Sequence, residues 1–318
     1  KENGMRSSKI IKTVSNDYPE SMFITWELSN ICNYSCSYCS PDLYGGSSGQ
    51  PNLDSSVNFF NNITKNINPY PKLLSLSGGE PTLWPKITDF LNRLDDSYYT
   101  EIVTNGSRTL RWWKSLFEKT NNIDRISLSV HVEFADVDHI IKLCELIHHK
   151  TLLTVMILFN PDYFSKAKLF GEALKQKQLN VSIRMKPITI KKQQIGITDY
   201  TKKQKDYIQN FFYNRHFNKK KIPIASKFIV DNDLKDVHWA NNLITNNEHS
   251  FKNWWCEMGK RRLYIDYTGT VYGATCMTAR KNPIGNIHTG EIQNINGMFC
   301  TSNFCPCVPD IRIPKYLT

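Results

Sequence analysis

The sequence alternates short apolar runs with longer stretches of helical periodicity, and this alternation restricts the possible fold more than any other feature. Six runs have the length of a buried strand and lie at 22–28, 73–76, 101–103, 126–130, 152–158 and 181–185. Helical patterns fall between them at 55–66, 84–94, 109–119, 137–148 and 165–177. Such strands pair in parallel through right-handed crossovers. Because a closed barrel needs eight units, we predict an α/β fold with a partial (β/α)6 barrel of the TIM type.

The pattern changes after the sixth strand. Residues 206–217 have the periodicity of one more helix, and residues 216–250 have the polar composition of a linker. Residues 263–272 alternate around Thr268-Gly269, which is typical of a β-hairpin. The expected organisation is an N-terminal segment, a barrel, a linker and a small cysteine-rich hairpin domain, at 1–21, 22–215, 216–250 and 251–318.

Composition restricts location and partners. No run approaches the ~18 to 20 apolar residues that span a bilayer, and residues 1–19 lack the apolar core of a secretory signal. We therefore expect a soluble, cytoplasmic protein without a membrane partner.

Lys and Arg exceed Asp and Glu by 40 to 29, a formal charge of +11, but the basic residues form short scattered runs. A solvated basic surface explains this better than a nucleic-acid or acidic-peptide partner.

The nine cysteines fall into two groups with one residue left over. Three lie between 32 and 39, five lie between 256 and 307, and Cys144 is alone on the apolar face of a predicted helix. Clustered cysteines without a secretory signal favour metal binding over disulfides, and an odd number cannot pair fully within one chain. We predict two metal-binding groups and assign Cys144 to the core.

The N-terminal group follows the first predicted strand as Cys32-Asn-Tyr-Ser-Cys36-Ser-Tyr-Cys39. Three thiolates on one loop can ligate three irons of a cubane cluster, which leaves the fourth iron open to a small molecule. Zinc is the alternative, but a zinc site would need a fourth Cys or His nearby, and none follows within the loop. The spacing therefore favours a catalytic iron–sulfur cluster.

This loop resembles the signature of the radical S-adenosylmethionine (radical SAM) superfamily, with Tyr38 as the aromatic residue before the last cysteine. The resemblance implies that Cys32, Cys36 and Cys39 are catalytic ligands of a [4Fe–4S] cluster. Its open iron would chelate the amino and carboxylate groups of S-adenosylmethionine (AdoMet), with Tyr38 against the adenine. The implied activity is reductive cleavage of AdoMet to methionine and a 5′-deoxyadenosyl radical, which abstracts hydrogen from a substrate.

A second match follows the second predicted strand. Ser77-Gly78-Gly79-Glu80-Pro81-Thr82 corresponds to the family segment that binds the methionine amino group. The resemblance gives this role to Glu80 and the adjoining backbone of Gly78 and Gly79, with Pro81 where a helix begins. Glycines also allow close approach of a backbone, and a carboxylate accepts hydrogen bonds from an ammonium group.

Further cofactor contacts are expected on the later strands. Thr104 and Asn105 begin a turn that is similar to one near the cofactor in the family, and Ser129, rather than Ser127, is the candidate ribose contact. Arg184 and Lys186 alternate with apolar neighbours. Both could point into the barrel toward a carboxylate, with Arg184 as a cofactor contact, or both could be exposed cations.

Two titratable residues follow the fourth strand at the expected barrel mouth. His131 and Glu133 could contact the substrate or act as acid and base. For Glu133, ordinary hydrogen bonding within the loop is the favoured interpretation.

The C-terminal cysteines are Cys256, Cys276, Cys300, Cys305 and Cys307. They resemble the twitch and SPASM extensions of the superfamily, and their number implies one auxiliary [4Fe–4S] cluster. A cubane takes four ligands. We choose Cys256, Cys276, Cys305 and Cys307, with Cys300 as the alternate ligand or a free thiol. A structural zinc ribbon is the competing interpretation.

The resemblance spans Met22 to Arg184 and Trp255 to Cys307, and it implies an oxidoreductase of the maturase type. The expected reaction oxidises or cross-links a peptide or protein side chain, with flavodoxin or ferredoxin as reductant. The alternatives are the same chemistry on a small polar metabolite, such as an aminocyclitol or sugar, and a non-enzymatic iron–sulfur electron carrier. The Gly-Gly-Glu-Pro segment argues against an electron carrier, because a carrier does not need a loop that binds methionine.

Overall fold

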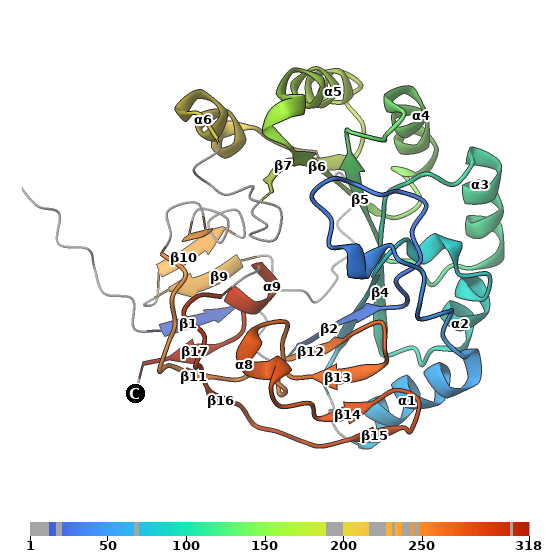
Figure 1. The fold of residues 1–318 in the computed structure, drawn as a ribbon. Coiled ribbons are helices and arrows are strands. Elements are labelled where there is room, and N and C mark those ends of the chain that lie inside the picture. The colour runs from blue at the N-terminus through green and yellow to red at the C-terminus, as the bar shows by residue number, and fades with distance from the viewer. Residues whose placement is uncertain are drawn as a thin grey trace, which may run out of the picture.

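The computed structural model describes residues 13–16, 21–66, 70–188, 200–215, 227–230, 233–236, 243–244, 248–305 and 308–317. Its centre is a curved sheet of parallel strands, β2 (Met22–Glu27), β3 (Lys72–Ser77), β4 (Tyr98–Thr104), β5 (Arg125–His131), β6 (Leu152–Phe159) and β7 (Val181–Pro187). The connecting helices are α1 (Leu53–Asn66), α2 (Ile87–Arg93), α3 (Leu110–Lys119), α4 (Val137–Ile147) and α5 (Phe164–Gln176). They lie outside the sheet (Figure 1). The predicted partial barrel is confirmed.

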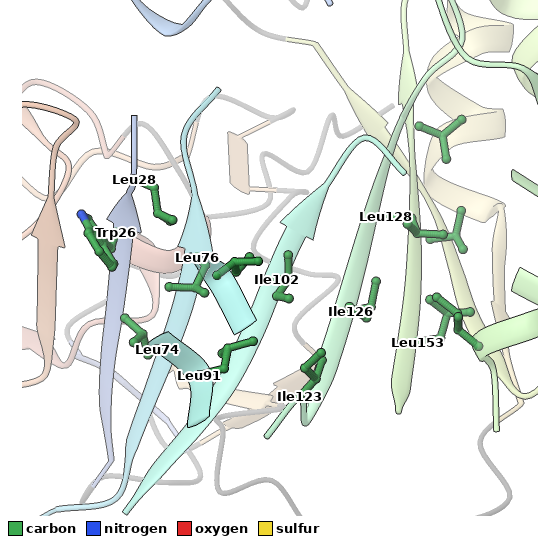
Figure 2. Close-up of a cluster of buried hydrophobic side chains, with 14 of the residues drawn as sticks. Trp26, Leu28, Leu74, Leu76, Leu91, Ile102, Ile123, Ile126, Leu128 and Leu153 are labelled. Carbon is green, nitrogen blue, oxygen red and sulfur yellow. The ribbon is translucent and has the colours of Figure 1, made fainter. Parts of the chain in front are cut away.

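The strand register aligns one row of apolar side chains beneath the helices. Paired positions run across the sheet through Trp26, Leu76, Ile102, Ile126 and Leu153. All five are at most 1% exposed, and Figure 2 shows this layer of side chains. Burying each such side chain contributes about 1.5–3 kcal/mol. Because side chains alternate along a strand, the intervening positions point into the barrel, where the polar residues lie.

Asp136 fixes the start of α4, as predicted: its carboxylate accepts a hydrogen bond from the His139 backbone N–H at 3.1 Å. We expect Asp136→Ala to lower the free energy of unfolding by about 1 kcal/mol, because the N–H loses its acceptor. Thermal melting should show a decrease of a few degrees in Tm. Asp138→Ala removes an equal charge from the same turn but leaves the cap, so a similar decrease there would contradict a capping effect.

The predicted C-terminal hairpin is confirmed and joins the barrel sheet. β12 (Arg262–Ile265) pairs antiparallel with β13 (Thr270–Tyr272), and Gly269 has a φ of 84° in the turn. β12 also pairs in parallel with β2, beside which it lies in Figure 1. β14 (Gly285–Asn286) and β15 (Glu291–Ile292) extend the same sheet. The hairpin therefore continues the edge of the barrel.

A second sheet collects strands from distant parts of the chain. Its order is β10 (Asp233–Asp236), β9 (Lys227–Val230), β1 (Thr13–Asn16), β17 (Lys315–Tyr316), β11 (Trp255–Cys256) and β16 (Met298–Phe299). Short helices α8 (Met277–Arg280) and α9 (Val308–Ile311) complete the described C-terminal region. Strands thus occur within the predicted N-terminal segment and the predicted linker. The proposed domain boundaries stay predictions.

The helix predicted at 206–217 is wrong at both ends. The helix is α6 (Lys202–Asn210), and β8 (Phe212–Asn214) follows it and pairs antiparallel with β7. A capping box between Thr201 and Gln204 starts the helix earlier than apolar periodicity suggests. No helix in the described ranges is both long and apolar enough to cross a membrane.

Candidate functional site

The cysteine loop leaves β2 at the edge of the sheet where the parallel strands end. Cys36 is buried, Cys32 and Cys39 are half-buried, and none of the three forms a disulfide with another described cysteine. A turn between the last two closes through a hydrogen bond of 2.9 Å from Cys39 N to Cys36 O. The Tyr34 backbone N–H donates to Cys32 Sγ at 3.3 Å. The loop is therefore an ordered support for three sulfur donors.

The glycine pair after β3 lies against the backbone that leads into the cysteine loop. Gly79 N donates to Ser29 O, and Glu80 N donates to Ile31 O, both at 2.8 Å. A Cβ on Gly79 would stand 2.2 Å from Ile31 O, and Gly78 has a φ of 119°. Both positions therefore require glycine for this close approach. The predicted contact of this segment with the methionine amino group stays a prediction.

Glu80 joins the loops that follow β3 and β4. Its buried carboxylate accepts hydrogen bonds from Thr82 N and Thr82 Oγ1, from Thr104 Oγ1 and from Asn105 N, at 2.6–3.1 Å. Burial raises the pKa of Glu80, and these hydrogen bonds oppose the shift. Three of the bonds go to Oε1 and one to Oε2, so Oε2 can still accept a hydrogen bond from an ammonium group. Pro81 starts a 3-10 turn, Pro81–Leu83.

Asn105 links the β4 loop to the first cysteine. Its Nδ2 lies 3.0 Å from Asn33 Oδ1 and 4.0 Å from Cys32 Sγ. Asn33 Nδ2 in turn donates to Ser107 Oγ at 2.9 Å, and Ser107 N donates to Asn105 Oδ1. Neither Asn33 nor Ser107 was predicted as a site residue. The only sequence signals for a role at the site are that Asn33 follows Cys32 and that Ser107 follows the Asn105-Gly106 turn.

Tyr38, which is buried, pairs with half-buried His131. The phenolic oxygen lies 2.6 Å from His131 Nδ1, and the rings stack with centroids 5.7 Å apart. Burial, together with the nearby Lys186 ammonium, lowers the pKa of His131 to about 4. Burial also raises the pKa of Tyr38. A neutral imidazole can thus accept a hydrogen bond from the phenolic O–H, which fixes the aromatic ring inside the cysteine loop. The predicted adenine contact of Tyr38 stays a prediction.

Glu133 bonds to the cysteine loop, in agreement with the favoured interpretation of that residue. Its Oε2 accepts from Ser37 N at 3.0 Å and from Ser37 Oγ at 3.1 Å. Ser37 lies between the second and third cysteines. The loop after β5 therefore supports the cysteine loop at Ser37, whereas the loop after β4 contacts it at Cys32 and Asn33.

The remaining predicted contacts lie on inward positions of the strands. Ser127 donates to Glu101 Oε1 at 2.6 Å, whereas Ser129 is half-buried one inward position further along β5. Of the two alternatives left open by the sequence, the structure favours the inward one: Arg184 and Lys186 both line a cavity inside the barrel, although Lys186 is also exposed. The Arg184 guanidinium lies 5.4 Å from the centre of the Phe212 ring.

The N-terminal donor set fits a [4Fe–4S] cluster with an open iron. Burial raises the pKa of Cys36 to about 12 and that of Cys39 to about 11, and it also raises the pKa of Cys32. The nearby cysteines reinforce the shift of Cys36 and Cys39. Binding of iron therefore has to displace the thiol protons. Three sulfur donors and no carboxylate make a set that suits iron–sulfur chemistry.

The structure gathers four of the C-terminal cysteines around one small cavity. Cys256, Cys276, Cys300 and Cys305 all line it, so Cys300, the predicted alternate, lies with the other three. Cys307, in the predicted set, lies outside the described residues. Burial raises the pKa of Cys256 to about 12, and Lys315 opposes the shift.

Lys315 is a buried ammonium at the same cavity. It donates to the backbone oxygens of Asp310, Ile311 and Ile313, each at 2.8 Å. Its charge can partly compensate thiolates there, so four thiols and one cation suit an iron–sulfur cluster. Throughout the described ranges, no three His, Cys, Asp or Glu side chains are grouped to hold a single metal ion.

Comparisons with known proteins agree with this geometry. A family model described as the radical SAM superfamily matches residues 26–143. A search of curated sequences found no match.

Solved structures share the fold at low identity. Similar chains are anSMEcpe with bound AdoMet, at a TM-score of 0.58 and 14% identity over 84% of this chain and 78% of that chain. A second anSMEcpe structure, with bound AdoMet and Kp18Cys peptide, has a TM-score of 0.54 and 15% identity, and the match covers 84% of this chain and 77% of that chain. SuiB from Streptococcus suis has a TM-score of 0.53 and 13% identity, and the match covers 85% of this chain and 64% of that chain.

Proposed function

Because this chain belongs to the radical SAM superfamily through residues 26–143, and is therefore an enzyme, we propose that it cleaves AdoMet reductively to oxidise or cross-link a peptide or protein side chain. Cys32, Cys36 and Cys39 would hold the [4Fe–4S] cluster. The observation that carries the proposal is the meeting of three loops at one edge of the sheet. The cysteine loop, the Gly-Gly-Glu segment and the Thr104-Asn105 turn are joined there by direct hydrogen bonds.

The chain's own residues would position and shield the reaction. When bound, the cluster and AdoMet supply the electron and the carbon radical. Glu80 holds two loops in register and keeps one oxygen lone pair toward an ammonium group. Cys36 and Tyr38 pack with Leu158 and Ile188 in a buried apolar cluster, which excludes water from one side of the cysteine loop.

A peptide or protein substrate is the class we favour. The fold is shared with anSMEcpe, one structure of which contains AdoMet together with the Kp18Cys peptide. A flavodoxin or ferredoxin would supply the electron. The same chemistry on a small polar metabolite is the second candidate, and a barrel cavity of about 470 Å³ has the size of a small-molecule site.

The direct test is anaerobic reconstitution with iron and sulfide, followed by reduction in the presence of AdoMet. We expect 5′-deoxyadenosine and methionine in equal amounts, measured by liquid chromatography and mass spectrometry. Reconstituted protein without reductant is the control. Full cluster occupancy without any 5′-deoxyadenosine would contradict the proposal and favour an electron carrier.

We also propose an auxiliary [4Fe–4S] cluster on Cys256, Cys276, Cys300 and Cys305. All four line one cavity and carry no disulfide. Four thiolates complete the ligand set of a cubane, so this cluster would have no open iron. It would suit electron transfer from the substrate side of the barrel, which is consistent with a net oxidation.

Cys276→Ala should remove the iron of one cluster per chain while AdoMet cleavage without added substrate stays within about twofold of wild type. The reason is that Cys276 lines the C-terminal cavity, whereas none of the three N-terminal cysteines is among its lining residues. Iron analysis and 5′-deoxyadenosine formation would be measured on the same reconstituted sample. Cys144→Ala, which removes a buried thiol from the barrel core, is the matched control. Retention of all iron, or zinc in its place, would contradict the auxiliary cluster.

A further inference from the structure

The interior of the barrel contains a cavity of about 470 Å³. Inward residues of β2 to β7 form its wall, and residues 308–314 lie against the end where the strands begin. Its volume falls in the range of about 300–1,000 Å³ that is typical of small-molecule sites. The cavity can therefore hold a metabolite or a few side chains of a peptide.

The charged residues of this wall are mostly cations. Among the described lining residues, one is a carboxylate, Glu101, and six are basic: Arg125, Arg184, Lys186, Arg261, Arg262 and Arg312. The only lining carboxylate is engaged on the wall itself. Glu101 accepts from Ser127 Oγ at 2.6 Å and lies 3.5 Å from Arg125 Nη1.

Two of the other cations have structural partners from the C-terminal region. Arg262 is buried, lies 3.4 Å from Asp310 Oδ1 and covers the Phe23 ring at 4.6 Å. Arg261 lies 3.4 Å from Glu257 Oε2. Two guanidinium donors of the cavity wall remain buried without an acceptor in the described part of the chain: Arg125 Nε and Arg261 Nη1. Buried donors of this kind are unfavourable unless a ligand or water satisfies them.

Arg184 and Lys186 add charge on β7, which is separated from Arg125 on β5 by one strand of the same sheet. They are two residues apart on β7, so both side chains project from the same face of the strand. A cavity lined by several basic groups suits a ligand with carboxylate or phosphate oxygens, because guanidinium groups bind such oxygens in pairs.

The cavity also extends between the two groups of cysteines. Met156 lines it and packs against the apolar cluster that contains Cys36 and Tyr38. Ile313 lines it at the other side and also lines the cavity of the four C-terminal cysteines. A ligand in this space would thus lie one side chain away from each of the cysteine sites.

We propose that this cavity is the substrate site and that it selects an anionic substrate, whose carboxylate or phosphate groups bind Arg125, Arg184 and Lys186. The inference rests on the proposed function, since it assigns the substrate of that same barrel. Two kinds of substrate can supply the anionic groups, a small polycarboxylate and an acidic peptide segment.

Binding is tested by titration calorimetry on the cluster-reconstituted full chain at low ionic strength. The probes are tricarballylate against its neutral triamide, and tetraglutamate against tetraglutamine. We expect at least one anionic probe to bind about tenfold or more tightly than its neutral partner, and to weaken by about tenfold or more in the double variant Arg184→Gln/Lys186→Gln. Arg111→Gln, which removes an exposed cation of α3, should leave the dissociation constant unchanged.

The two anionic probes distinguish the sources: tricarballylate binding indicates a small metabolite, and tetraglutamate binding indicates an acidic peptide. Equal binding of charged and neutral probes, or full retention of binding in the double variant, would overturn the proposal. So would displacement of the anionic probe by saturating AdoMet, because the cations would then serve the carboxylate of AdoMet. Failure to form 5′-deoxyadenosine would remove the radical chemistry without altering these isotherms, so the two proposals fail separately.

Discussion

Cys36→Ala should reduce 5′-deoxyadenosine formation to the level of samples without protein. The loop would then offer two thiolates, which cannot hold the three-ligand cluster that leaves one iron open. Loss of an outer-shell partner of a metal site costs about 10–100-fold, so loss of a ligand should cost more than about 100-fold. The measurement is AdoMet cleavage under anaerobic reduction, together with the iron content of the same sample.

The variant needs a control for folding, because Cys36 is buried in a small apolar cluster with Tyr38. Cys144→Ala removes an equally buried thiol from α4 and should retain cleavage and iron. Circular dichroism and Tm should show that both variants keep the barrel. Cleavage at the wild-type rate by Cys36→Ala would remove this cysteine from the catalytic group, and loss of cleavage in both variants would indicate a general effect of core thiols.

Much of the barrel could be predicted because its strands are either continuous apolar runs or alternate clearly between apolar and polar residues. The apolar run around Leu74 and Leu76 indicated the buried strand that the structure shows, whereas the alternation of Arg184 and Lys186 with apolar neighbours left open whether they point into the barrel. Such local signals depend only on which side chains avoid water. The strand ends were less visible, since polar residues such as Lys72 continue β3 beyond its apolar run.

Long-range pairings could not be predicted from the same signals. β12 pairs with β2 although more than two hundred residues separate them, and nothing in the hairpin sequence specifies that partner. The link from Asn105 to Asn33 is of the same kind. The cavity that gathers Cys300 with Cys256 depends on how three separate segments pack, which spacing alone does not determine.

The candidate site therefore depends on a contact between loops, and Gly79 is where that contact is most sensitive. We expect Gly79→Ala to lower Tm by about 10 °C and to reduce cluster loading. The added Cβ would lie 2.2 Å from Ile31 O, 2.5 Å from Ile31 C and 2.9 Å from Ile31 N. All three are backbone atoms, so no side-chain rotation relieves the clash.

The two backbones would have to separate, which breaks the hydrogen bonds from Gly79 N to Ser29 O and from Glu80 N to Ile31 O. Each bond contributes about 0.5–1.5 kcal/mol, and overpacking adds about 1–3 kcal/mol, so a loss of about 3 kcal/mol or more is expected. Thermal melting and iron content would be measured together. Gly45→Ala, in the segment between β2 and α1 that also contains the cysteines, places its Cβ 3.3 Å from Pro41 O and should change neither value strongly. Equal Tm and equal iron in Gly79→Ala and Gly45→Ala would show that the loops need not touch for the cysteines to bind iron.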